Sequence, residues 1–152
     1  MAKLPTTEQF WQFSLQLYPT IQQPLLGWQE QLGANVNLML LLLYAEQQHW
    51  HWSAADLALL QQAVTEPNQL YTQPIRLLRR QLSDQPTLKQ ALLQAELEAE
   101  KIEQQYLLAA CPPPDLKQNA SELLKSYLQS LQPADISMLE SNLFDLYQSL
   151  PR

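Results

Sequence analysis

NLMLLLLYAEQQ, residues 37–48, is apolar on all sides when it is wound as a helix. A helix of this kind is buried by its neighbours, whereas a surface helix carries a single apolar stripe. Asn35 or Asn37 can cap its first turn, because an amide oxygen accepts a free backbone N–H there. The apolar run of residues 38–45 is far shorter than the roughly 20 residues that span a bilayer. We therefore expect a central core helix and no membrane association.

Helical periodicity continues on both sides of this stretch. We predict an all-α, single-domain bundle of seven or eight helices over residues 1–152, with the apolar helix at about 36–48 in its centre. Pro19 should end the first helix and Pro24 should start the second, which Gly33 closes. The later helices are expected to start at Ser53, at Pro67 with a new start at Pro74, and at about 87, 115 and 134.

The longest helix should run from Thr87 to Ala110, where the CPPP sequence stops it. Its apolar positions alternate four and three residues apart, which is typical of a heptad seam between packed helices. The seam residues are Leu88, Leu92, Ala95, Ala99, Ile102, Tyr106 and Ala109. Beyond it, residues 115–150 should form a C-terminal helical hairpin.

Composition excludes several classes of function. The chain has 152 residues with only 2 Gly, which argues against phosphate-cradling loops and against many-turned β-barrels. Its net charge is −6, and only residues 71–101 are slightly basic, so a nucleic-acid partner is not expected. Cys111 is the single cysteine, which excludes an internal disulfide framework and fits a reducing compartment. We predict a cytoplasmic protein.

A cluster of charges stands out between the fifth segment and the longest helix. On a helical projection Arg79 lies at the edge of the apolar stripe that contains Ile75, so its guanidinium needs a carboxylate or several carbonyls. The longest helix offers one ridge of three glutamates at positions 96, 100 and 103. Because the connection between the two helices is short, they should be antiparallel neighbours whose opposite charges can meet.

We interpret this cluster as structural ion pairs. The alternative is a pocket for an anionic small molecule. In either case the residues concerned are Arg76, Arg79, Arg80, Glu96 and Glu100.

Neither catalytic residues nor a cofactor or metal site can be assigned. Glu46 and His49 have the Glu-x-x-His spacing of di-iron helices, but that chemistry requires a second such motif and further glutamates. His51 is the only other histidine. We expect residues 49–52, HWHW, to end the central helix and to cover the edge of the core with aromatic rings.

Four segments in order suggest a family. FWQFSLQLY at 10–18, WQEQLGANVNLMLLLLY at 28–44, QPIRLLRRQL at 73–82 and AELEAEKIE at 95–103 resemble the bacterial family called domain of unknown function 2390, over about residues 8–110. The resemblance implies a small cytoplasmic protein without an assigned activity. The family pattern usually has an acidic residue where this chain has Asn35, which weakens any proposal that a carboxylate acts there.

These observations favour a non-enzymatic interaction or scaffold protein. We expect a protein partner or a homo-oligomer. The alternative is a small-molecule binding protein or an enzyme that uses the Arg/Glu cluster.

Overall fold

The computed structural model describes residues 3–82, 84–117 and 121–151, and 77% of it is helical. The all-α prediction is confirmed, although a two-residue strand pair is also present. In chain order the elements are α1 (Thr7–Leu32), α2 (Val36–Gln47), β1 (Trp50–His51), α3 (Ala54–Pro67), the π-helical turn η1 (Asn68–Thr72), α4 (Gln73–Arg80), α5 (Pro86–Ala110), β2 (Asp115–Leu116), α6 (Leu123–Ser130) and α7 (Ile136–Ser149). Since α3, η1 and α4 follow one another without a break, the described residues form six separate helical rods rather than seven or eight.

The apolar helix α2 is the centre of the core. Nine of its residues are buried, including every residue from Leu38 to Leu43. Asn35 caps it, because its side-chain oxygen accepts the Leu38 N–H at 2.9 Å. α1, α5 and α6 pack against α2. α6 reaches both ends of α2, because Leu124 bonds to Glu46 and Tyr127 bonds to Asn35.

The prediction of two helices before the centre is wrong, because α1 runs through both Pro19 and Pro24. Its buried stripe continues across both prolines at a helical spacing: Phe10, Ser14, Leu17, Ile21, Leu25 and Trp28. Each proline leaves one carbonyl without its helical N–H, but the carbonyls four residues earlier belong to the exposed Leu15 and Thr20, where water can reach them. Packing therefore outweighs the two lost bonds. Gly33 ends this helix with φ 71°, as predicted for its end.

Residues 50–51 form a strand, which the sequence did not predict. β1 pairs antiparallel with β2, so that Trp50 lies opposite Leu116 and His51 opposite Asp115. Trp50 is buried, as is Trp52, whose Nε1 donates to the Pro112 carbonyl at 3.1 Å. The C-terminal hairpin consequently starts at Leu123 and not near residue 115.

Two expectations for the middle of the chain are also corrected. Pro67 is the last residue of α3 rather than the start of a new helix. The buried side of α5 is also not the heptad seam, since Leu88 and Tyr106 are 50% and 40% exposed. Glu96, Ala99, Glu103, Gln104 and Leu107 are its buried residues. The side that faces the neighbouring helices is therefore largely polar.

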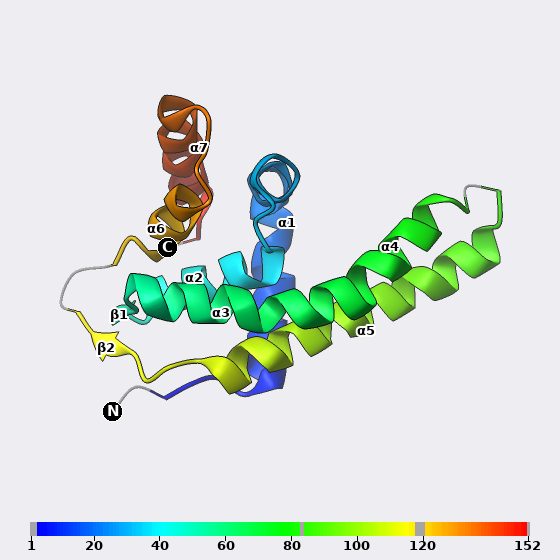
Figure 1. Ribbon diagram of the computed structural model, residues 1–152, viewed down its shortest axis with the longest axis horizontal. Coiled ribbons are helices and arrows are strands. Elements are labelled where there is room, and N and C mark those ends of the chain that lie inside the picture. Colours follow the sequence, from blue (N-terminus) through cyan, green and yellow to red (C-terminus); the bar gives the residue numbers. More distant parts are fainter. Residues whose placement is uncertain (1–2, 83, 118–120, 152) are drawn as a thin grey trace.

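The helices give the molecule two ends (Figure 1). α4 and the first half of α5 lie side by side as an antiparallel arm that projects past α1, while α6 and α7 stand at the other end. No residue of α4 is buried. Among the described residues, no helix combines the length and the apolar character that crossing a bilayer requires.

Candidate functional site

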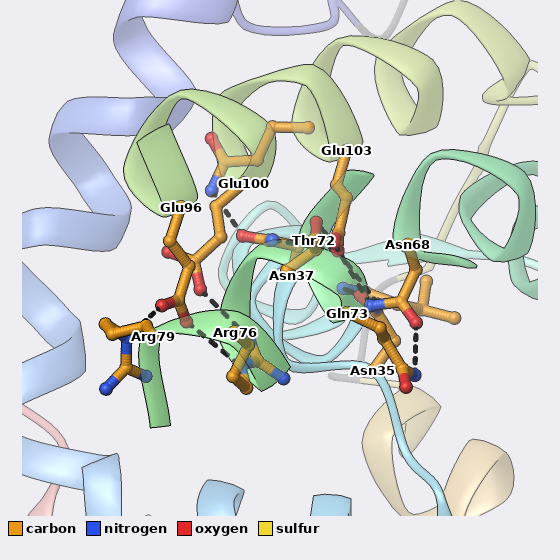
Figure 2. A network of polar contacts seen from close by, with 12 residues as sticks. Asn35, Asn37, Asn68, Thr72, Gln73, Arg76, Arg79, Glu96, Glu100 and Glu103 are labelled. Carbon is orange, nitrogen blue, oxygen red and sulfur yellow. Dashed lines mark hydrogen bonds and ion pairs between the residues drawn. The ribbon is translucent and has the colours of Figure 1, made fainter. Parts of the chain in front are cut away.

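One carboxylate on α5 holds two arginines of α4. Glu96 Oε1 accepts a hydrogen bond from Arg79 Nε at 2.6 Å, and Glu96 Oε2 accepts one from Arg76 Nε at 2.9 Å (Figure 2). Arg76 Nη2 also lies 3.5 Å from Glu100 Oε1. The three side chains that meet at Glu96 are between 11% and 19% exposed. Charge-assisted pairs in such a sheltered place are stronger than pairs on an open surface.

The pKa values of the two glutamates in this cluster are shifted in opposite directions. Burial raises the pKa of Glu96, but the hydrogen bonds and charges of Arg79 and Arg76 outweigh burial, so that the net shift is downward. For Glu100, burial raises the pKa to about 7, because Arg76 opposes it only in part and Glu103 and Glu96 add to it. Glu96 is therefore a permanent anion at neutral pH, whereas Glu100 changes its charge near pH 7.

A second carboxylate, Glu103, is almost completely buried, with 2% exposure, and bonds to neutral donors only. Its Oε1 accepts from Asn35 Nδ2 at 2.9 Å and from Asn37 Nδ2 at 3.2 Å. Its Oε2 accepts from Asn68 Nδ2 at 3.1 Å and from the Thr72 hydroxyl. These four donors replace the water that a buried carboxylate loses. They also tie the start of α2 and both ends of η1 to α5 (Figure 2).

The π-helical turn explains how two of these donors reach Glu103. Pro74 has no N–H, and in a regular helix its ring would clash with the carbonyl four residues earlier. The helix widens just before it, and the Gln73 N–H bonds to the carbonyl of Asn68, five residues back. Within this wider turn Asn68 and Thr72 both face α5.

The polar contacts continue to α1 through Gln104. Its Nε2 donates to Asn37 Oδ1 and to Ser14 Oγ, each at 2.9 Å. The Ser14 hydroxyl in turn donates a hydrogen bond to the Phe10 carbonyl within α1. Gln104 Oε1 is buried and has no hydrogen-bond partner among the described residues. The network thus crosses from α1 through α5 and α2 to η1, beside the ion pairs of α4.

The structure brings together most of the residues that the sequence singled out. Arg76, Arg79, Glu96 and Glu100 meet, and Asn35 and Asn37 lie on the neighbouring carboxylate. Arg80 lies apart from them, because it is exposed and forms no ion pair within the described ranges.

Sequence reasoning missed the other members of this network. They are Ser14, Asn68, Thr72 and Gln104, together with the role of Glu103 as their common acceptor. The i, i+4 spacing of Asn68 and Thr72 is the one signal of a shared polar face that the sequence contains.

The Glu-x-x-His residues serve other contacts. Glu46 Oε2 accepts the Leu124 N–H at 2.8 Å, and Oε1 accepts the Tyr147 hydroxyl at 2.7 Å. His49 has φ 59° where α2 gives way to β1, and His51 Nδ1 lies 3.3 Å from Ser121 Oγ. In the part of the chain that the structure describes, no three His, Cys, Asp or Glu side chains are grouped so as to hold a metal ion.

A groove of about 440 Å3 lies between α6 and α7, with Glu46 at its inner side. Its charged lining consists of Glu46, Glu122, Lys125 and Glu140, and its aromatic lining consists of Phe144 and Tyr147. Phe144 is 64% exposed, and the Lys125 Nζ and Glu140 Oε1 atoms are 3.9 Å apart. We call this feature the α6–α7 groove. It combines apolar surface with an excess of carboxylates.

The family model with the description "Protein of unknown function (DUF2390)" matches residues 9–107. The chain belongs to the DUF2390 family. This match agrees with the resemblance seen at about residues 8–110. The DUF2390 segment contains the whole Arg/Glu cluster and the Glu103 network, whereas α6 and α7 follow it. No curated protein and no solved structure matches the chain significantly.

Proposed function

We propose that this DUF2390 protein is a non-enzymatic, cytoplasmic interaction protein whose α4–α5 arm binds a protein partner. The observation that carries the proposal is the surface of α4. The arm exposes large apolar side chains although it projects from the molecule. Leu77 is 61% exposed and Leu78 is 47% exposed. Exposed apolar side chains on a projecting helix commonly form the contact surface for a protein partner.

The Arg/Glu cluster supports this proposal by holding the arm together. Both Glu96 oxygens accept arginine hydrogen bonds, so the principal anion of the cluster comes from the chain itself. A free anionic ligand would have to compete with Glu96 for the same two guanidinium groups. We therefore favour a structural role for the cluster over the alternative of an anionic-ligand site.

Affinity capture from extract of the native cell tests the proposal. Tagged protein with Leu77→Gln is compared with tagged Leu59→Gln, because Leu59 is an exposed leucine of α3 outside the arm, at 48% exposure. We expect Leu59→Gln to retain the proteins that the unaltered chain captures and Leu77→Gln to lose them. Equal capture by both variants would contradict binding through the arm. Mass spectrometry of co-purified metabolites tests the alternative, since an anion that is retained by the wild type and lost in Arg79→Met would support a ligand site.

A further inference from the structure

The outward side of α4 is both apolar and basic. Arg76 and Arg79 point to α5, where they bond to Glu96. Leu77 and Arg80 each follow one of these arginines by one position, about 100° further around the helix, and both are exposed. Because they are three residues apart, they lie beside each other along one exposed flank of α4, next to Arg76. We call Leu77 and Arg80 the arm face.

The α6–α7 groove has the complementary character. Three carboxyl groups line it against the single ammonium group of Lys125. Glu140 is 55% exposed at its rim, and the neighbouring Phe144 presents an aromatic surface that the other described residues leave open. An exposed leucine next to an arginine fits such a surface, because the leucine can cover the ring while the guanidinium pairs with a rim carboxylate.

The arm face and the groove cannot meet within one molecule. The arm projects at one end of the fold, and α6 and α7 stand at the other (Figure 1). Each molecule therefore offers one copy of each surface to its neighbours.

We propose that the arm face of one copy binds in the α6–α7 groove of a second copy. This inference rests on the proposed function, and it names the partner of the arm. Leu77 would contact Phe144, and Arg80 would pair with Glu140 or Glu122. Two copies form a symmetric dimer if each binds its arm face in the groove of the other. If only one such contact forms per pair of copies, it produces a ring or an open chain.

Two variants test the inference, each with one surface removed. The arm variant carries Leu77→Gln and Arg80→Gln, and the groove variant carries Phe144→Gln and Glu140→Gln. All four positions are exposed, so the helices should stay folded, which circular dichroism verifies. Leu59→Gln is the control for the loss of an exposed leucine elsewhere.

Sedimentation equilibrium gives the readout. The wild type and Leu59→Gln should have masses above 17.6 kDa that rise with concentration. Each surface variant should associate with itself at least roughly tenfold more weakly, as expected when the central contacts of an interface are removed. An equimolar mixture of the two variants should form a heterodimer that grows no further, because only one intact arm and one intact groove remain to meet.

Three results would overturn the inference. The first is a wild type that stays at 17.6 kDa up to millimolar concentration. The second is a mixture that stays monomeric while the wild type associates, since that would indicate a different interface. The third is a surface variant that associates as well as the wild type. If the wild type is monomeric and Leu77→Gln still loses a cellular partner, the arm binds another protein, so the proposed function stands and the second copy is excluded.

Discussion

Asn35 and Glu103 are 68 residues apart in the chain, yet Asn35 Nδ2 donates a 2.9 Å hydrogen bond to Glu103 Oε1. The oxygen of the same amide accepts the Leu38 N–H and so caps α2. One side chain thus caps the central helix and supplies one of the four hydrogen bonds to a buried carboxylate. An aspartate could keep the cap, but it could not donate to Glu103.

Asn35→Asp should therefore destabilise the protein at pH 7.5 by about 2–4 kcal/mol, because it faces one buried carboxylate with another. Urea unfolding at pH 7.5 measures the difference from the wild type. Asn35→Ser serves as the control, since it keeps a cap without adding a charge. An Asn35→Asp protein as stable as the wild type at pH 7.5 would contradict this account of Glu103.

Glu96 should matter more for stability than either of its arginines alone. Glu96→Leu leaves both Arg76 and Arg79 without their main partner, which should cost about 3–5 kcal/mol. Arg79→Ala should cost less, about 1–3 kcal/mol, because Glu96 keeps Arg76. The double variant Arg79→Met with Glu96→Leu should recover part of the larger loss. These free energies of unfolding come from urea titration at pH 7.5, and a larger loss for Arg79→Ala than for Glu96→Leu would contradict the shared pairing.

The raised pKa of Glu100, about 7 in the fold against an ordinary 4.5, predicts a pH dependence of stability. Between these values the folded state binds more protons than the unfolded state, so stability falls as the pH rises from about 4.5 to 7. Glu100→Gln removes this contribution. The variant should be about 1–3 kcal/mol more stable than the wild type at pH 8 and little changed at pH 4.5.

Unfolding at several pH values measures the difference between the wild type and Glu100→Gln. Burial also raises the pKa of Glu46, so the wild-type slope contains both carboxyl groups, and the difference between the two proteins isolates Glu100. An equal loss of stability in Glu100→Gln at every pH would mean that its pair with Arg76 dominates instead.

Leu41 is fully buried in the middle of α2. Leu41→Asp should cost roughly 4 kcal/mol or more, because it places a charge in an apolar interior without a partner. Leu59→Asp, on the exposed side of α3, should change stability by less than about 1 kcal/mol. Thermal melting of both variants provides the comparison, and similar melting temperatures would place α2 outside the core.

The features that follow from local patterns could be predicted from the sequence. The all-round apolar character of residues 38–43 indicated a central helix, and the structure buries all six. The edge position of Arg79 pointed to a carboxylate on the next helix, and its Nε lies 2.6 Å from Glu96 Oε1. In both cases one periodic segment, or two segments joined by a short turn, contained the information.

The features that depend on distant partners could not be predicted. Apolar periodicity predicted that Leu88 and Tyr106 lie on the buried side of α5, but both are exposed. The polar side around Glu103 is buried instead, because residues at the start of α2 and in η1 donate hydrogen bonds to this carboxylate. The strand at Trp50 depends on a partner at Leu116, far along the chain. Pro19 marked a helix end by propensity alone, and the continuous buried stripe of α1 overrides it.

The position of α6 determines what can fold without it. Leu123, Leu124, Tyr127 and Leu128 of α6 belong to the same core as α2. The Tyr127 hydroxyl also accepts the Asn35 N–H at 3.0 Å and donates to Gln61. A fragment that stops at residue 107 would keep the whole DUF2390 match, yet it would expose the leucines of α2 to water. In this chain the unit of sequence similarity is thus smaller than the unit of folding, and truncation at the family boundary should yield an aggregating fragment.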